Sequence, residues 1–229
     1  MPKERIMPLV IGITGSIASG KSTACKYLVG GGAAYCDADK LVHRMYDPGK
    51  PAFARIIEAF GPEIVGKDGY IDRKLLGAKV FGKPKAMLTL TTAIGDIQAE
   101  VRKVIDSWRR NLQDNEIALL EAVNFIEAGY GRFSDFTWLF AVNDDIAIER
   151  LKFRNDLSTQ AAKQRLASQR SWIDREPAAD LVTHNNGSND AFIKSVDKEM
   201  SKIHSQWLKG TLSVSRYHAW WKIQSSEPV

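Results

Sequence analysis

Short apolar runs alternate with longer amphipathic stretches along this chain. Runs rich in branched and aromatic residues predict buried strands at residues 9–14, 33–36, 116–122, 136–142 and 181–183. Helical spacing predicts helices at residues 22–29, 39–46, 51–60, 75–81, 87–111, 146–179 (broken near Pro177) and 191–208. Because strands alternate with helices, the sequence predicts an α/β fold with a parallel sheet covered by helices on both faces.

The composition is that of a globular protein, with 44% hydrophobic and 26% charged residues and a formal net charge of +5. Basic residues are spread along the chain and form no concentrated patch typical of a nucleic-acid binder, and a mild positive balance suits an anionic small-molecule substrate. The two cysteines, Cys25 and Cys36, are too few for a disulfide scaffold and lack zinc-site spacing. No apolar run reaches the ~18 residues that cross a bilayer. We expect a cytoplasmic protein, a monomer or small homo-oligomer, that binds neither nucleic acid nor membrane.

A glycine-rich motif joins the first expected strand to the first expected helix. The residues Gly15, Ser16, Ile17, Ala18, Ser19, Gly20, Lys21 and Ser22 fit the pattern G-x-x-x-x-G-K-[ST], and Thr23 follows them. In such a loop, backbone N–H groups surround phosphate oxygens at the positive end of a helix. Lys21 then reaches the β- and γ-phosphates, and the Ser22 hydroxyl binds Mg²⁺. The motif predicts that the protein binds a nucleoside triphosphate.

Carboxylates follow two of the expected strands, at the sheet edge where α/β proteins bind ligands. Asp37 and Asp39 come directly after the second strand, and each is able either to take the proton of an attacking hydroxyl or to cap the next helix. Glu121 closes the third strand, where an acidic group holds Mg²⁺ through water or is simply a solvated strand end. Glu127 is a weaker candidate of the same kind.

Arginines are dense in the charged segment that follows the fourth strand. Arg150 and Arg154 lie four residues apart on one helical face, and the density continues with Arg165, Gln169, Arg170 and Arg175. Arginines in a closing lid neutralise charge on a phosphoryl group during transfer, whereas a solvated helix face carries charges without such a role. We expect a lid here.

The set of motifs resembles the dephospho-CoA kinase family, in the family's order and approximate spacing from residue 11 to residue 187. The matching positions are residues 11–23, 36–39, 60–61, 68–73, 75–81, 126–127, 149–151, Arg154, Arg165, Gln169, 179–180 and 185–187. The P-loop is generic, but the aspartates of residues 37–39, Asp-Gly at 68–69 with Arg73, and Ala-Asp at 179–180 with Asn185 are more specific to the family.

The resemblance implies a P-loop kinase-type parallel sheet of five strands, with a helical acceptor-binding subdomain and a lid. It implies transfer of the γ-phosphoryl group of ATP to the ribose 3′-hydroxyl of dephospho-CoA, which yields coenzyme A and ADP with Mg²⁺ as cofactor. By resemblance, Asp39 is the general base, and the other catalytic residues are Lys21, Arg150 and Arg154. The acceptor contacts implied by the resemblance are Asp37, Asp39, His43 and Arg73. Asn185 joins the P-loop in binding ATP, and Ser22 and Glu121 hold the metal.

We expect one domain over residues 1–229. Its core comprises residues 6–40, 114–149 and 179–204; residues 41–112 form the helical insertion, residues 150–178 the lid and residues 205–229 a tail. The tail holds Trp207, Trp220 and Trp221, which suit either a helix packed on the core or a partner surface.

Two departures from the family pattern lie near the expected acceptor site. Ile94-Gly95 replaces a His-Pro pair, and Val123-Asn124-Phe125 replaces Pro-Leu-Leu. They leave open a second hypothesis, a P-loop kinase for another nucleoside or nucleotide acceptor. A third is a nucleotide-binding switch in which Asp39 only caps a helix. A GTPase is disfavoured because no Asn-Lys-x-Asp stretch occurs in the chain.

Overall fold

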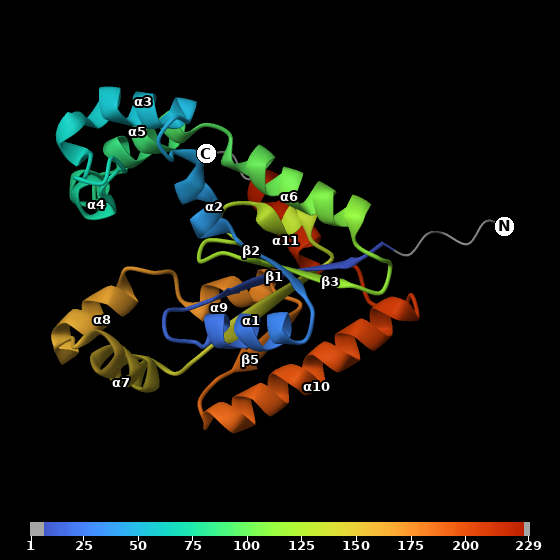
Figure 1. Cartoon of the computed structure of the whole chain (residues 1–229). Coiled ribbons are helices and arrows are strands. Elements are labelled where there is room, and N and C mark those ends of the chain that lie inside the picture. Colours follow the sequence, from blue (N-terminus) through green and yellow to red (C-terminus); the bar gives the residue numbers. More distant parts are fainter. Residues whose placement is uncertain (1–6, 227–229) are drawn as a thin grey trace. The chain divides into compact units, whose positions relative to one another are not determined.

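The computed structural model describes residues 7–226 and contains a five-stranded parallel sheet (Figure 1). The strands are β1 (Leu9–Gly15), β2 (Ala34–Asp37), β3 (Ile117–Glu121), β4 (Phe136–Ala141) and β5 (Leu181–His184), in the order β2-β3-β1-β4-β5. The register pairs Ile13 of β1 with Glu121 of β3 and Gly15 of β1 with Phe140 of β4. The five expected strands and the P-loop kinase-type sheet are therefore confirmed, with β1 at the centre.

The chain divides into two compact units, which are described separately. Residues 7–36 and 104–226 form the larger unit, and Asp37–Lys103 form the smaller one. The larger unit holds the sheet, the end of α6 (Ile97–Asn111), and the helices α1 (Lys21–Gly30), α7 (Asp144–Asn155), α8 (Thr159–Ala167), α9 (Trp172–Arg175), α10 (Asn189–Leu208) and α11 (Arg216–Ser226). The smaller unit holds α2 (Ala38–Met45), α3 (Pro51–Phe60), α4 (Arg73–Val80), α5 (Pro84–Ile94) and the start of α6.

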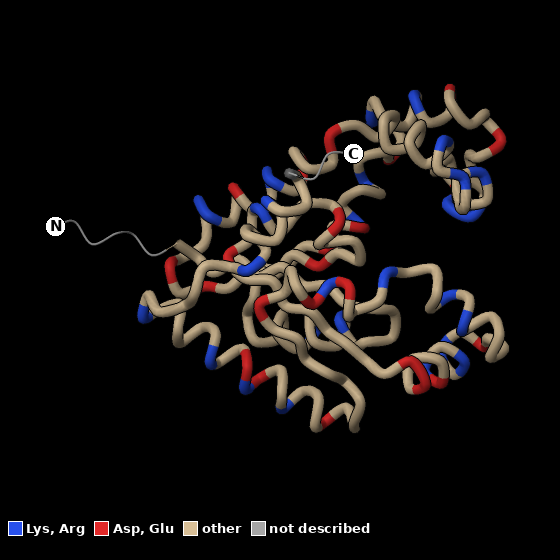
Figure 2. The backbone as a smooth tube through the Cα atoms, turned by 180° about the vertical axis from the view of Figure 1, so that it is seen from behind, with Lys and Arg blue, Asp and Glu red and all other residues tan. Residues whose placement is uncertain are grey.

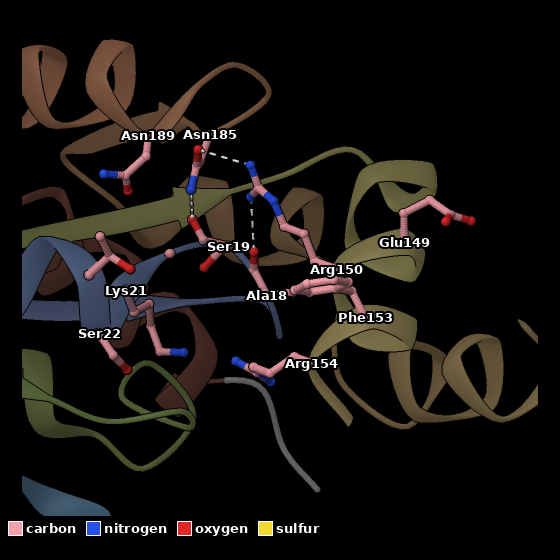
Figure 3. A pocket seen from close by; sticks show the side chains of 12 residues that line it. Ala18, Ser19, Lys21, Ser22, Glu149, Arg150, Phe153, Arg154, Asn185 and Asn189 are labelled. Atoms are coloured by element: carbon pink, nitrogen blue, oxygen red, sulfur yellow. Dashed lines mark hydrogen bonds between the residues drawn. The ribbon is translucent and has the colours of Figure 1, made fainter. Parts of the chain in front are cut away.

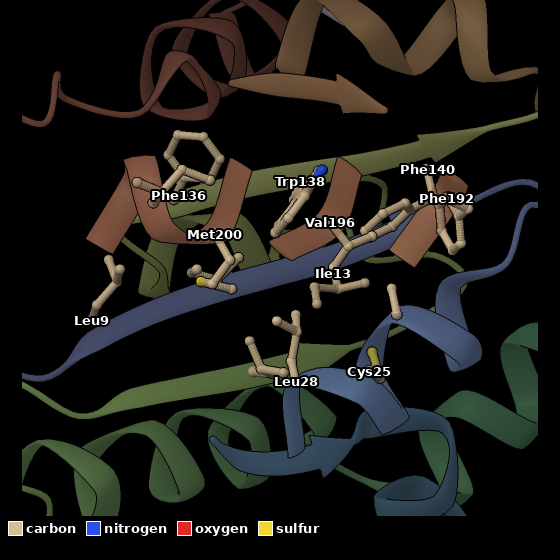
Figure 4. Close-up of a cluster of buried hydrophobic side chains, with 14 residues drawn as sticks. Leu9, Ile13, Cys25, Leu28, Phe136, Trp138, Phe140, Phe192, Val196 and Met200 are labelled. Atoms are coloured by element: carbon tan, nitrogen blue, oxygen red, sulfur yellow. The ribbon is translucent and has the colours of Figure 1, made fainter. Parts of the chain in front are cut away.

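Alternation along β1 builds the core of the larger unit. Leu9, Ile11 and Ile13 are fully buried on one face of the sheet, where they meet apolar side chains of α1 and α10 (Figure 4). The ring of Phe125 packs at Gly12, where an added Cβ atom would lie 1.8 Å from a ring carbon. Gly12 thus admits an aromatic ring to the sheet near the start of the P-loop.

The smaller unit has an apolar core of its own. Buried residues from α3, α4 and α5, among them Ile56, Leu76 and Ala93, form one cluster with Ile64 and Ile71. Val65 and Ile71 also form an isolated antiparallel bridge. Figure 2 shows several basic positions gathered around α4 in this unit.

The expectation of one helix over residues 87–111 is wrong, because two helices, α5 and α6, occupy this segment. Gly95 ends α5 with a φ of 103°, in the left-handed region that favours glycine. The Arg55 guanidinium then donates from Nε to the carbonyl of Ala93 at 2.8 Å, which satisfies a carbonyl of the last turn. Apolar spacing continues across this break because Ile94 and Ile97 both pack on the same core.

The charged segment expected at residues 146–179 is three α-helices, α7, α8 and α9, followed by the short 3₁₀ helix η3 (Glu176–Ala178). Asp156 ends α7 in a left-handed conformation with a φ of 50°, and the Ser158 side chain caps α8 by accepting from the Ala161 N–H. The break is set by local capping, which the helical charge pattern does not reveal.

The tail contains a helix packed on the core. Trp207, in the last turn of α10, packs against the main cluster and donates from Nε1 to the Met7 carbonyl at 2.9 Å. After α10 the chain turns into α11, whose Tyr217 is fully buried and stacks on Trp221. No helix among the described residues is long and apolar enough to span a membrane.

Candidate active site

The P-loop motif forms the connection between β1 and α1. Gly20, the residue before α1, has a φ of 93°, and a Cβ atom there would lie 2.3 Å from the side-chain nitrogen of Asn185. The first turn of α1 contains no acidic residue, and within the described chain no side chain caps it. Its N–H groups and the positive end of the helix dipole therefore favour an anion at this position.

A cavity of about 830 Å³ opens beside this loop (Figure 3). Its walls come from the P-loop, α7, the residue after β5 and the start of α10; the lining residues are Ala18, Ser19, Gly20, Lys21, Ser22, Thr23, Glu149, Arg150, Phe153, Arg154, Asn185 and Asn189. A volume of this size is ordinary for a cofactor or nucleotide site. The cavity and the helix terminus together form a binding site for a phosphorylated ligand.

Arg150 and Asn185 tie the cavity walls to the P-loop. Arg150 donates from one guanidinium nitrogen to the Ala18 carbonyl at 3.1 Å and from the other to the Asn185 side-chain oxygen at 3.2 Å. Asn185 in turn donates to the Ser19 carbonyl at 3.1 Å. Arg150 thus lies beside the P-loop, and its guanidinium binds the loop's backbone.

Arg154 lies one helical turn after Arg150. Its Nε donates to the Asn155 side chain at 3.2 Å, and Figure 3 shows its guanidinium and the Lys21 amine both directed into the cavity. Phe153, between these arginines in sequence, is 96% exposed although it lines the cavity. Sequence patterns did not single out Phe153, because an exposed aromatic residue within a helix gives no periodic signal.

The two candidate metal-binding residues lie in contact. Glu121 is buried at the end of β3, and its Oε1 accepts the Ser22 hydroxyl at 3.2 Å. Its Oε2 accepts the Tyr35 hydroxyl at 2.6 Å. Mg²⁺ keeps several waters and takes one or two protein oxygens, so a hydroxyl and a carboxylate in contact are groups of the kind that this ion binds. Tyr35 was missed by sequence analysis, since a tyrosine on a strand carries no motif.

Glu127, the weaker metal candidate, has a different environment. Its Oε1 accepts from Nε of Arg175 at 2.7 Å, and Arg175 is 1% exposed. Arg175 was grouped with the lid arginines, but it is buried in this ion pair and does not line the phosphate cavity. The two opposite charges thus neutralise each other inside the larger unit.

Gln169 connects the helical segment 150–178 to the P-loop. Its side-chain oxygen accepts from the Ile17 N–H at 3.0 Å. Together with the bonds from Arg150 to Ala18 and from Asn185 to Ser19, this bond means that three separate side chains hold the P-loop backbone.

Asp37 and Asp39 have different environments in the smaller unit. Asp37 caps α2, since its Oδ1 accepts from the Lys40 N–H at 3.0 Å, and it also forms an ion pair with the Lys40 amine. Asp39 is exposed in the first turn of α2, two residues after the end of β2. The capping role that the sequence left open between the two aspartates belongs to Asp37.

The smaller unit contains a second cavity, of about 490 Å³, lined by Lys40, His43, Arg44, Tyr46, Asp47, Asp68, Tyr70, Ile71 and Arg73. Arg73 Nη1 lies 3.0 Å from Nδ1 of His43. Burial, and then the nearby Arg73 charge, lower the pKa of His43, so Nδ1 of the neutral ring accepts from the guanidinium. Three cationic side chains (Lys40, Arg44 and Arg73) against two carboxylates (Asp47 and Asp68) favour an anionic ligand here.

Comparisons with known proteins identify the family of this chain. The dephospho-CoA kinase family matches residues 9–191. A dephospho-CoA kinase of Symbiobacterium thermophilum is 34% identical, over 86% of this chain and 80% of that protein. One from Lactococcus lactis is 31% identical, over 86% of this chain and all of that protein. The solved structure of the dephospho-CoA kinase from Campylobacter jejuni superposes with a TM-score of 0.64 at 28% identity, covering 86% of this chain and 97% of that one. The chain belongs to the dephospho-CoA kinase family and is an ATP-dependent kinase.

Proposed function

We propose that this protein transfers the γ-phosphoryl group of ATP to the ribose 3′-hydroxyl of dephospho-CoA, giving coenzyme A and ADP. The observation that carries the proposal is the P-loop cavity with Lys21, Arg154 and the Ser22–Glu121 pair around it, in a chain of this family. In the transfer, the 3′-oxygen forms a bond to the γ-phosphorus while the bond from the γ-phosphorus to the bridging oxygen breaks.

The triphosphate of ATP binds at the open first turn of α1. Lys21 at the start of the helix and Arg154 across the cavity supply positive charge to the β- and γ-phosphates. Arg150 and Asn185 keep the P-loop backbone in place through their bonds to Ala18 and Ser19. Positive groups fixed before the reaction stabilise charge that develops on the phosphoryl oxygens.

Mg²⁺ fits the contact between Ser22 and Glu121. The buried carboxylate accepts hydrogen bonds on both oxygens, from Ser22 and from Tyr35, and is thereby held in one orientation. Ser22 would bind the ion through its hydroxyl and Glu121 through water. When bound, the ion neutralises phosphate charge.

Asp39 is the general base. Its carboxylate takes the proton of the 3′-hydroxyl as that oxygen attacks, and Asp37 supports it by starting α2 at this position. The exposed carboxylate suits a base that must meet a bound hydroxyl.

The smaller unit binds the acceptor, and α7 and α8 form the lid. The second cavity offers Lys40, Arg44 and Arg73 to the anionic phosphates of dephospho-CoA, and neutral His43 orients Arg73. Ile94 and Gly95, the departure from the family pattern in this unit, end a helix against the core and Arg55, so they act on the fold of the unit.

An acceptor panel tests this function. ADP release from ATP and Mg²⁺ is measured with dephospho-CoA, with AMP, with adenosine and with no acceptor. The proposal expects stimulation by dephospho-CoA alone. Turnover with AMP or adenosine and none with dephospho-CoA would instead support a kinase for another nucleotide, the alternative raised by Val123-Asn124-Phe125.

A further inference from the structure

Helix α11 is a feature of this chain outside the part matched by its family. It covers Arg216–Ser226, whereas the family match ends at residue 191. The Lactococcus lactis relative is matched over its full length yet covers only 86% of this chain. α11 packs against η2 (Tyr130–Phe133), η3 and β4, on the side of the sheet away from α10 (Figure 1). It therefore lies next to residues 122–129, which we name the β3 loop because they directly follow β3.

Tyr217 is the contact between α11 and the β3 loop. It is fully buried, and its hydroxyl donates to the Ile126 carbonyl at 2.8 Å. Its ring meets Phe125 edge to face at 6.4 Å and covers Gly131, where a Cβ atom would lie 2.4 Å from the ring. Burial raises the pKa of Tyr217, so the hydroxyl stays protonated and keeps donating.

The β3 loop is in turn fixed to the strand that carries the P-loop. Phe125 packs on Gly12, and the Thr14 hydroxyl donates to the Val123 carbonyl at 3.1 Å. Between these two anchors, Asn124 is exposed. A chain of contacts therefore runs from α11 through Tyr217 and Phe125 to β1, with one polar side chain presented to solvent.

The start of α11 is also held firmly. Both oxygens of the Asp180 carboxylate accept bonds from this region, one from the Ser215 hydroxyl and one from the Arg216 N–H, each at 2.6 Å. The oxygen that binds Ser215 also accepts from the Thr137 N–H of β4. Hydrogen bonds to Asp180 therefore fix the start of α11, the helix that carries Tyr217, against the sheet.

The β3 loop borders Glu121 and the P-loop strand, yet the residues that line the phosphate cavity include none from it. Its exposed residue, Asn124, follows the carboxyl end of β3, the sheet edge where α/β proteins bind ligands. We propose that α11 positions the β3 loop for the acceptor, with Tyr217 as the positioning residue and Val123-Asn124 as the acceptor-facing part. The identity of the acceptor rests on the proposed function.

Two variants and one control test this role. Tyr217→Phe keeps the ring and removes the bond to Ile126, Gly131→Ala pushes a methyl group into the ring, and Lys222→Ala changes an exposed residue on the same helix. In the full-length enzyme, KM for dephospho-CoA and for ATP is measured together with amide hydrogen exchange of residues 122–130. For Tyr217→Phe we expect the acceptor KM to rise about three- to tenfold, as for one buried hydrogen bond. In the same variant, hydrogen exchange in the β3 loop should become faster, and the KM for ATP should stay within about twofold of the wild-type value. The Lys222→Ala control should match wild type in all three measurements.

The outcomes separate positioning from a purely structural role. Unchanged exchange and acceptor KM in Tyr217→Phe and Gly131→Ala would overturn the proposal. So would an equal rise of both KM values, or a loss of folded enzyme at constant KM. If wild type does not use dephospho-CoA while the variants still speed exchange in the β3 loop, the proposed function fails and positioning by α11 stands.

Discussion

The hydroxyl of Tyr35 offers a sharp test of how the metal-binding carboxylate is held. Tyr35→Phe removes one atom, the donor to Glu121 Oε2 at 2.6 Å, and leaves the Ser22 bond to Oε1 in place. Hydrogen bonds to charged groups contribute about 1.5–3 kcal/mol net. Because the Tyr35 side chain is 37% exposed, water is able to replace the lost donor, and we take the low end of that range. A loss of ~1.5 kcal/mol corresponds to about a tenfold weaker interaction.

The assay is the rate of ADP formation with dephospho-CoA as a function of Mg²⁺ concentration at saturating ATP. We expect Tyr35→Phe to need about ten times more Mg²⁺ for half-maximal rate, as for other changes to the groups that orient metal ligands. The maximal rate returns near the wild-type value at high Mg²⁺.

Tyr27→Phe is a matched control, because Tyr27 is also exposed and donates to a carboxylate, that of Asp197, at 2.8 Å outside the cavity. Its Mg²⁺ dependence should equal that of wild type. Superimposable curves for wild type and Tyr35→Phe would show that the orientation of Glu121 has no bearing on the metal.

Three further predictions concern the base, the buried ion pair and His43. Asp39→Asn should lower kcat about 10²–10⁴-fold with ATP affinity kept, by rate and ATP-binding measurements, and near-normal turnover would contradict its role. Arg175→Leu should lower the free energy of unfolding, measured by urea titration, by about 3–5 kcal/mol, because Glu127 loses its ion-pair partner. A loss below ~1 kcal/mol would show that water solvates the Glu127 carboxylate. Because the pKa of His43 lies below its ordinary 6.5, the folded state binds fewer protons, so stability contributed by His43 is present above pH 6.5 and lost as pH falls further. His43→Asn should therefore flatten the loss of stability between pH 7.5 and pH 5, and an unchanged pH profile would count against it.

Strands and phosphate loop were predictable because each is specified locally. The β1 run is apolar on both faces and ends in a glycine motif with fixed spacing, so residues 9–22 specify a strand, a turn and a helix start without tertiary information. The contact of Ser22 with Glu121 follows from the parallel pairing of β1 and β3, since Ser22 begins the helix that follows β1 and Glu121 ends β3 at the same edge of the sheet.

What escaped prediction depends on neighbours distant in sequence. Gly95 breaks a helix whose apolar spacing continues across the break, and Arg175 is buried because Glu127, 48 residues away, pairs with it. Tyr35 and Tyr217 act through single hydroxyls aimed at partners 86 and 91 residues away. No local pattern encodes such contacts, because their energy exists only once the sheet has formed.

Transfer of the γ-phosphoryl group of ATP to the 3′-hydroxyl of dephospho-CoA is observable by ³¹P NMR of dephospho-CoA incubated with the protein, ATP and Mg²⁺. We expect a new phosphomonoester resonance that is coupled to the ribose 3′ proton and grows together with ADP. We expect neither product with Lys21→Ala. Formation of ADP with the ribose unmodified, or phosphate on another hydroxyl, would contradict this transfer.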